Sequence, residues 1–218
     1  MDRRTTAGPL LLILIVAVGL IFAVWQPVEV DTVFAWGERL AGNPLTLALL
    51  VVVQILLFTF ALPGSTIIWA IAPFLPPWIA VPVLVSGATA GAVGAYFLSG
   101  RLSRDWRVGP ASRRVIGLLE QRGDFLTQTA LRALPGFPHS IVNYAGGILR
   151  LPLPGFIAAA LVGLGVKWWV YASAIHGLAT AARGDEALGG RELLPLFILA
   201  VLLLIAGLVK WKLRQRSL

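Results

Sequence analysis

The chain has 218 residues, of which 58% are hydrophobic and 13% are charged, and its formal net charge is +8 at pH 7. This apolar content excludes an ordinary soluble domain and favours an integral membrane protein. The chain has no cysteine and two histidines, which excludes disulfides, thiolate metal sites and cysteine nucleophiles, so we expect no metal and no other cofactor. The basic residues stand in short loops beside apolar runs. Their positions therefore indicate how the chain is oriented in the membrane, and they favour contact with anionic lipid headgroups over binding of nucleic acid.

Residues 1–43 are expected to hold a membrane span and an external segment. A short basic stretch precedes an apolar run from Pro9 to Trp25. A cleavable signal peptide is the alternative interpretation, but no small-x-small cleavage site follows the run, so we favour a retained span. Residues 26–43 carry three acidic side chains and predict an external segment with an amphipathic piece at 33–40.

A first re-entrant hairpin is predicted over residues 44–79. Two apolar arms flank the Pro63-Gly64 break, and prolines close the second arm. Neither arm reaches the roughly 20 helical residues needed to cross about 30 Å of hydrocarbon. A full span is predicted at 80–99, where Gly87, Gly91 and Gly94 share a face that lets another helix approach closely.

A second hairpin is predicted over residues 125–150, after a polar segment (100–124) that holds six arginines. Residues 113–119 of that segment predict an amphipathic helix lying on the membrane surface. Two prolines in the sequence Pro135-Gly-Phe-Pro138 prevent one continuous helix. Inside a membrane such a break survives only where protein or a wet cavity satisfies the freed backbone groups.

Two further spans are predicted at 155–173 and 193–209, joined by a polar loop at 181–192 and followed by a basic tail. Placing the basic segments inside puts both termini in the cytoplasm. We therefore predict an all-α integral membrane protein with four transmembrane helices and two oppositely oriented re-entrant hairpins, an inverted repeat. Residues 44–180 form its central domain, between the regions 1–43 and 181–218. Six full spans would leave both Pro-Gly breaks inside spanning helices.

Polar residues beside the breaks are the candidate substrate-binding groups. Arg132 can donate paired hydrogen bonds to a lipid phosphate, or can snorkel to the interface. His139 and Asn143 share a helical face, and either can instead satisfy backbone carbonyls freed by the turn. The remaining candidates are Ser140 and the pair Ser65 and Thr66, whose hydroxyls can also cap a helix.

Three further charged residues and the prolines and glycines of the hairpins complete the candidates. Lys167 is a cavity charge or an interfacial anchor beside two tryptophans. Glu120 or Asp124 can pair with Arg122 or Arg132. We assign a structural role in the hairpins to Pro63, Gly64, Pro135, Gly136, Pro138 and Gly147.

The stretch that contains Glu120, Gly123, Leu131-Arg132, Pro135, Pro138, Asn143-Tyr144 and Gly147 resembles the DedA / SNARE-associated (VTT-domain) superfamily. It is most similar to the branch named after the yeast Tvp Golgi proteins. The resemblance covers residues 45–180 and implies paired re-entrant hairpins and movement of lipids between leaflets. This chain has Ser65 and Pro138 where the classical DedA branch has an acidic residue and a second arginine. Those two residues are tied to proton-coupled transport of lipid phosphates in that branch, so the resemblance supports neither proton coupling nor a phosphate carrier specifically and leaves the coupling open.

We therefore expect a lipid translocase, a scramblase or flippase of the cell (cytoplasmic) membrane. It would move phospholipids or polyprenyl-phosphate-type lipids through a polar seam at the hairpin tips. The alternatives are a secondary transporter of small solutes or ions and a membrane scaffold that docks partners on the 101–122 loop. No GxSxG, HExxH or P-loop pattern occurs, so we do not expect an enzyme. The oligomeric state is not predicted.

Overall fold

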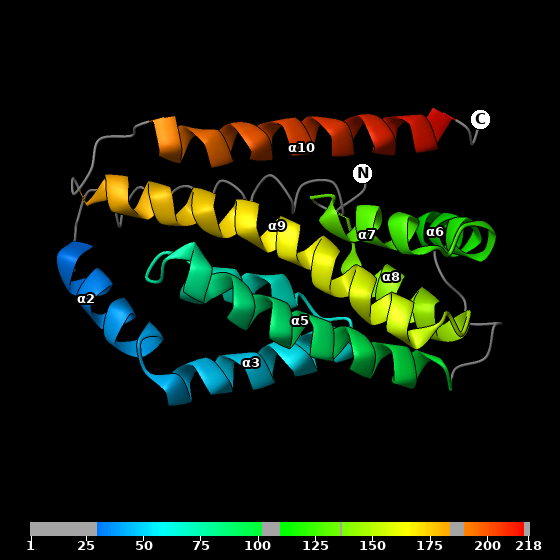
Figure 1. The fold of residues 1–218 in the computed structure, drawn as a ribbon, viewed down its shortest axis with the longest axis horizontal. Helices are drawn as coiled ribbons and strands as arrows, with labels where there is room; N and C mark the ends of the chain where they lie inside the picture. Colours follow the sequence, from blue (N-terminus) through cyan, green and yellow to red (C-terminus); the bar gives the residue numbers. More distant parts are fainter. Residues whose placement is uncertain (1–29, 102–109, 136, 184–189, 216–218) are drawn as a thin grey trace, which may run out of the picture. The chain divides into compact units, whose positions relative to one another are not determined.

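The computed structural model describes residues 30–101, 110–135, 137–183 and 190–215 of the chain, and within these ranges the regular structure is helical, without strands (Figure 1). The chain divides into two compact units, residues 1–36 and 37–218. The second unit contains both Pro-Gly breaks and is described below. The predicted span at 9–25 lies outside the described residues.

The first half of the second unit begins with the end of α2 (Val30–Ala41) and continues with α3 (Pro44–Thr59). The side chain of Asn43 caps α3 by accepting a hydrogen bond from the Leu45 amide at 2.9 Å. The helix ends before Ala61, whose φ of 60° lies in the left-handed region. A short helix η1 (Gly64–Ile67) and a single turn α4 (Ile68–Ile71) form the return arm. The observed elements follow the predicted arm, break and short return.

The second half contains two short helices separated by the proline-rich break. They are α7 (Phe125–Ala133) and α8 (His139–Ile148), preceded by α6 (Pro110–Gln121). Leu134 leaves the helical region with ψ of 127°, because a residue before proline is sterically excluded from it. The α7 and α8 helices are about 14 and 15 Å long at 1.5 Å per residue, so neither crosses a bilayer alone.

Each break-carrying arm packs on the long helix that follows it in the sequence. Helix α3 packs on α5 (Pro77–Ser99), and α7 packs on α9 (Leu153–Ala182). A Cβ added at Gly91 of α5 would lie 2.6 Å from the Phe58 Cβ of α3. One added at Gly163 of α9 would lie 2.6 Å from the Thr129 carbonyl oxygen of α7. Both contacts therefore depend on glycine, as predicted for the α5 face.

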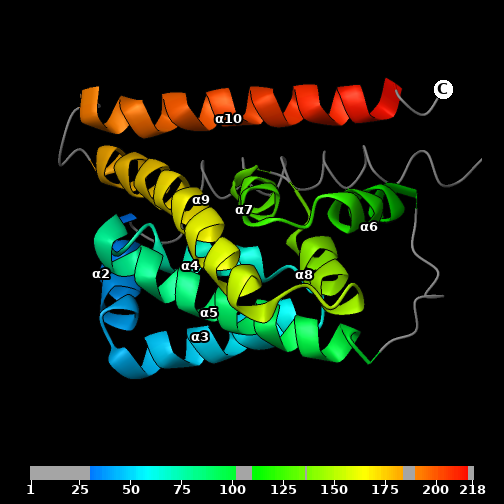
Figure 2. The ribbon, with the colours of Figure 1, turned by 45° about the vertical axis from the view of Figure 1, so that its right-hand side comes forward.

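Helices α5 and α9 lie side by side and run in opposite directions, as their colours show in both views (Figures 1 and 2). Helix α8 packs on α5, where a Cβ at Gly147 would lie 2.0 Å from the Tyr96 carbonyl oxygen. Helix α10 (Gly190–Gln215) packs on α9. The two break-carrying segments thus pack on two antiparallel helices, as the predicted inverted repeat requires.

Two helices, α5 and α9, are long and apolar enough to cross a membrane. The helices Thr32–Ala41 and Pro44–Thr59 meet this test only together and are bent by 79° at the break between them, so the described residues give two candidate spans, or three if the bent pair is one span. In α10, the described apolar stretch is Leu194–Ile205. The protein is therefore an all-helical membrane protein, and the arrangement of four spans with two re-entrant hairpins stays a prediction.

Candidate functional site

A cavity of about 520 Å³ lies where the two Pro-Gly breaks come together. The first break lines it with residues 61–66, and the second lines it with residues 137–140. Helix α9 closes it with Lys167, Trp168 and Tyr171. Two segments separated by more than seventy residues thus share one cavity wall, and this is the arrangement that two hairpin tips meeting each other would give.

Lys167 and His139 bring the polar chemistry into this cavity. Their exposed fractions are 5% and 6%, and the Lys167 Nζ atom contacts the Nε2 atom of His139. The ammonium group lies 5.2 Å from the centre of the Trp168 ring and 5.6 Å from that of Tyr171. Aspartate and glutamate are absent from residues 39–104 and 125–184. A buried cation therefore stands in the cavity wall without a carboxylate beside it.

Arg132 is fully buried but does not line the cavity. Its guanidinium lies 4.5 Å from the centre of the Phe156 ring and donates from Nη1 to the carbonyl and side-chain oxygens of Gln128, both at 3.4 Å. The Nε and Nη2 atoms of Arg132 have no hydrogen-bond partner. The structure thus places Arg132 between α7 and α9, and places Lys167 at the position where the sequence analysis expected Arg132.

The other predicted polar residues lie at different depths. Ser65, Thr66 and Ser140 line the cavity, and the Thr66 hydroxyl donates to the Pro63 carbonyl at 2.9 Å. Asn143 is 3% exposed and lies one turn beyond His139 in α8, outside the cavity lining. The hairpin tips therefore contribute the two serines and Thr66 beside the Lys167–His139 contact.

The predicted structural residues lie in the breaks or in tight packing. Pro63, Gly64 and Pro138 line the cavity, and Pro135 is buried. A Cβ at Gly64 would lie 2.8 Å from the Phe58 ring, so the first break rests directly on α3. Gly136 lies outside the described residues.

Glu120 and Asp124 do not form the predicted ion pairs. Neither pairs with Arg122 or Arg132 in the described part of the chain. Asp124 instead caps α7, because its carboxylate accepts hydrogen bonds from the Thr127 amide at 2.9 Å and from the Thr127 hydroxyl at 3.0 Å. These bonds lower the pKa of the exposed Asp124 carboxyl from its usual value. Glu120 is exposed near the end of α6.

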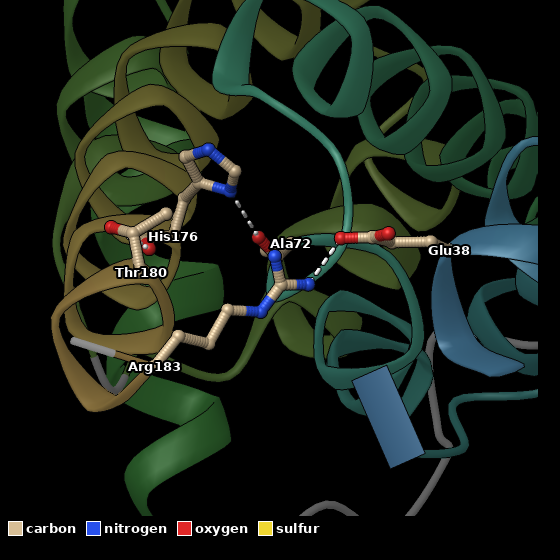
Figure 3. A network of polar contacts seen from close by, with 5 residues as sticks. All are labelled: Glu38, Ala72, His176, Thr180 and Arg183. Carbon is tan, nitrogen blue, oxygen red and sulfur yellow. Dashed lines mark hydrogen bonds and ion pairs between the residues drawn. The ribbon is translucent and has the colours of Figure 1, made fainter. Parts of the chain in front are cut away.

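A second polar network lies near the C-terminal end of α9 (Figure 3). His176 Nδ1 donates to the Ala72 carbonyl at the end of α4, at 3.3 Å, and the Thr180 hydroxyl donates to the His176 carbonyl at 3.0 Å. One turn further, Arg183 forms an ion pair with Glu38 of α2. These contacts fasten the return arm of the first hairpin and the end of α2 to α9.

The aromatic residues of the cavity and the buried amide of Gln54, which lies outside the cavity lining, were not predicted. Phe58, Phe137 and Trp168 line the cavity, and the amide of Gln54 in α3 is fully buried with neither polar atom bonded. The spacing of Lys167 and Tyr171, four residues apart in one helix, was a usable signal for the aromatic wall. This spacing places Lys167 and Tyr171 on one face of their helix, but it does not predict which other helices that face contacts.

The fold and the cavity define a helical membrane protein with two proline-broken helical segments that meet at one cavity. The VTT domain family model matches residues 62–177, which include both breaks, all of α5 and most of α9. The chain belongs to the VTT-domain family, which confirms the superfamily predicted from the sequence.

The relatives found by sequence similarity carry the name transmembrane protein 41. The Caenorhabditis elegans transmembrane protein 41 homolog is 28% identical over 171 residues, covering 76% of this chain and 70% of the relative. Transmembrane protein 41B of Gallus gallus is 26% identical over 201 residues, covering 87% and 75%. The human transmembrane protein 41B is 25% identical over the same length, covering 87% and 69%. No solved structure matched the chain.

Proposed function

We propose that this protein is a lipid translocase that lets phospholipid or polyprenyl-phosphate-type headgroups pass between leaflets through the cavity at the two breaks. The observation that carries the proposal is the shared lining of that cavity by residues 61–66 and 137–140, together with a buried cation. A headgroup that crosses a bilayer needs polar contacts at the depth where lipid offers none. Serine, histidine and lysine side chains supply such contacts here.

The short helices beside the cavity support the same function. Helix α3 has 16 residues and is about 24 Å long, shorter than the hydrocarbon layer of about 30 Å. A short apolar segment thins the lipid around it, which shortens the path of a headgroup. The acyl chains would stay in lipid beside exposed apolar side chains such as Leu62 and Trp69.

We further propose that the protein lies in the cytoplasmic membrane with both termini inside, and that it acts without catalysing a chemical reaction. The charge distribution supports the orientation, because the six arginines between residues 100 and 124 and the basic C-terminal tail belong on the cytoplasmic side. Anionic or other phosphate-bearing lipids are the proposed partners.

Leaflet exchange of fluorescent phospholipid in proteoliposomes tests the function. Purified protein should make the inner-leaflet lipid accessible to an external quencher, whereas protein-free vesicles should not. Ser140→Trp should block exchange, because it fills the cavity beside His139. The matched control is Ser86→Trp, at an exposed site of α5 outside the cavity lining.

Two outcomes would replace the proposal. Uptake of a soluble solute without lipid exchange would favour the small-solute or ion transporter. If the pure protein moves neither, and deletion of residues 101–122 abolishes its cellular effect while Ser140→Trp does not, the scaffold function holds.

A further inference from the structure

We propose that Lys167, His139 and the first turn of α8 form a binding site for a singly charged phosphodiester, the headgroup phosphate of the lipid that the cavity admits. The lipid as the source of this anion rests on the proposed function. The anion site itself rests on the geometry of the cavity.

The contact between Lys167 and His139 leaves a hydrogen-bond donor without an acceptor. A lysine ammonium group only donates, so with Lys167 protonated, Nε2 of His139 accepts from it and the ring hydrogen sits on Nδ1. If the proton moves to the ring instead, Nδ1 still carries a hydrogen. In both cases the pair holds one positive charge. The Nδ1 atom is buried and has no hydrogen-bond partner in the structure.

The start of α8 adds two more donors at the same place. His139 and Ser140 are the first residues of this ten-residue helix and line the cavity. Their amides have no intrahelical acceptor, and Pro138, at the cap position, makes no side-chain hydrogen bond to them. A helix N-terminus also carries partial positive charge, which favours an anion. The unpartnered Nδ1 atom of His139 and the free amides at the start of α8 thus both indicate an anionic ligand.

The charge of the site selects the class of anion. Every residue that lines the cavity lies within residues 39–104 and 125–184, which contain no acidic side chain, so the lining itself does not balance the charge and an anionic ligand would. A phosphodiester carries one negative charge and matches the single charge of the Lys167–His139 pair. A phosphate monoester carries about 1.5 to 2 negative charges at neutral pH and leaves an unbalanced buried charge. Of the two lipid types in the proposed function, the site therefore favours phospholipids over polyprenyl monophosphates. The rings of Trp168 and Tyr171, whose centres lie 5.2 and 5.6 Å from the Lys167 Nζ atom, add cation–π contacts that hold this single charge in the cavity wall.

Nitrogen NMR of ¹⁵N-histidine-labelled protein tests the site directly, because the chain has only two histidines. His139→Gln assigns the signals by removing one set. We expect His139 to show a protonated Nδ1 that shifts on titration with dimethyl phosphate and with short-chain phosphatidylglycerol. Inorganic phosphate should bind more weakly.

Charge variants separate a ligand contact from a packing role. Lys167→Met should weaken dimethyl phosphate binding about tenfold to hundredfold, the loss expected for a charge-assisted hydrogen bond. Lys167→Arg should restore most of the affinity. The control is Arg122→Gln, which removes an exposed cation outside the cavity and should change nothing.

The outcomes distinguish this inference from the proposed function. If neither ligand shifts the His139 signals of the wild-type protein, the anion site is overturned, whether or not the protein exchanges lipid. Binding of dimethyl phosphate but not of phosphatidylglycerol keeps the anion site and overturns the lipid as its source. A wild-type affinity for inorganic phosphate equal to that for dimethyl phosphate overturns the phosphodiester selectivity.

Discussion

Arg132 and Lys167 are both buried cations, but they lie against different partners. Arg132 lies over Phe156 between two packed helices, whereas Lys167 contacts His139 in the cavity wall. A charge in an apolar interior is expensive unless other groups compensate it. The ring of Phe156 and the oxygens of Gln128 compensate Arg132 in part. Lys167 lines the cavity and contacts His139 there, which makes it the better candidate for a ligand contact.

The contact of Arg132 with Phe156 predicts a measurable coupling. Phe156→Leu should lower the free energy of unfolding by about 1–2 kcal/mol through lost packing, and by about 0.5–2 kcal/mol more through the lost cation–π contact. In an Arg132→Met background only the packing loss should remain. A double-mutant cycle of thermal unfolding in detergent measures the difference, and equal effects of Phe156→Leu in both backgrounds would remove the cation–π contact from the account.

Asp124 predicts a pH dependence of stability. Its pKa is lowered by the hydrogen bonds from Thr127, so the cap stabilises the folded protein above the carboxyl's pKa in the unfolded chain. The stabilisation is lost as the pH falls through the lower pKa of the folded state. Asp124→Asn keeps an accepting oxygen but does not titrate.

Thermal unfolding between neutral and acidic pH checks this prediction. Wild-type protein should lose more stability on acidification than the Asp124→Asn variant, and Asp124→Ala should be less stable than Asp124→Asn at neutral pH. Identical pH profiles for wild type and Asp124→Asn would contradict it.

At the scale of helices, the breaks were predictable and the packing partners of the polar residues were not. Prolines and paired apolar arms predict both breaks because proline excludes a continuous helix wherever it stands. By contrast, the span predicted at 155–173 is observed as α9, which continues to Ala182. The polar residues of this extra length, His176 and Thr180, bond to carbonyls of α4 and of α9 itself. The partner of His176, the Ala72 carbonyl, is more than one hundred residues away in the sequence and arises from tertiary structure.

The close contact of α3 with α5 predicts that Gly91→Ala destabilises the protein. The added methyl group would meet the Phe58 Cβ at 2.6 Å and the Ile55 carbonyl oxygen at 2.9 Å. Because backbone atoms cannot move aside locally, α3 must shift, at a cost of about 1–3 kcal/mol. Thermal unfolding measures this loss.

The matched control is Gly165→Ala in α9, where an added Cβ has nothing within 4 Å. This variant should be neutral or gain up to about 1 kcal/mol, since alanine favours helix more than glycine does. Equal losses at Gly91 and Gly165 would show that the α3–α5 contact does not depend on the small residue.

At the scale of the whole molecule, the sequence predicts that the two breaks meet, and the described structure brings them to one cavity. Charge and length patterns suffice for this, because they constrain which segments can cross and from which side. They do not predict which cation lines the cavity. Arg132 was predicted as the phosphate contact because an ionisable residue inside a membrane is a functional candidate by default. The structure instead places that side chain against Phe156, while Lys167 comes from a helix later in the chain.

The proposed orientation predicts opposite accessibility of the two loop regions. The chain has no native cysteine, so in each single-cysteine variant the labelling reports the accessibility of that one position. In intact cells a membrane-impermeant thiol reagent should label Arg39→Cys and should label Arg122→Cys only after permeabilisation; both native side chains are exposed. Labelling of both from outside, or the reverse pattern, would contradict the positive-inside assignment.

Reversible cross-linking of the two hairpin tips tests the central claim most directly. Ser65→Cys and Ser140→Cys place one thiol on each break at the cavity lining, and a short reducible cross-linker can join them in proteoliposomes. If lipid passes between the two breaks, lipid exchange should stop when they are joined and return when the linker is reduced. The control pair Ser86→Cys and Ser140→Cys should not cross-link. Undiminished lipid exchange through fully cross-linked protein would contradict a lipid path between the two breaks. Failure of the two positions to cross-link would contradict the meeting of the breaks at one cavity.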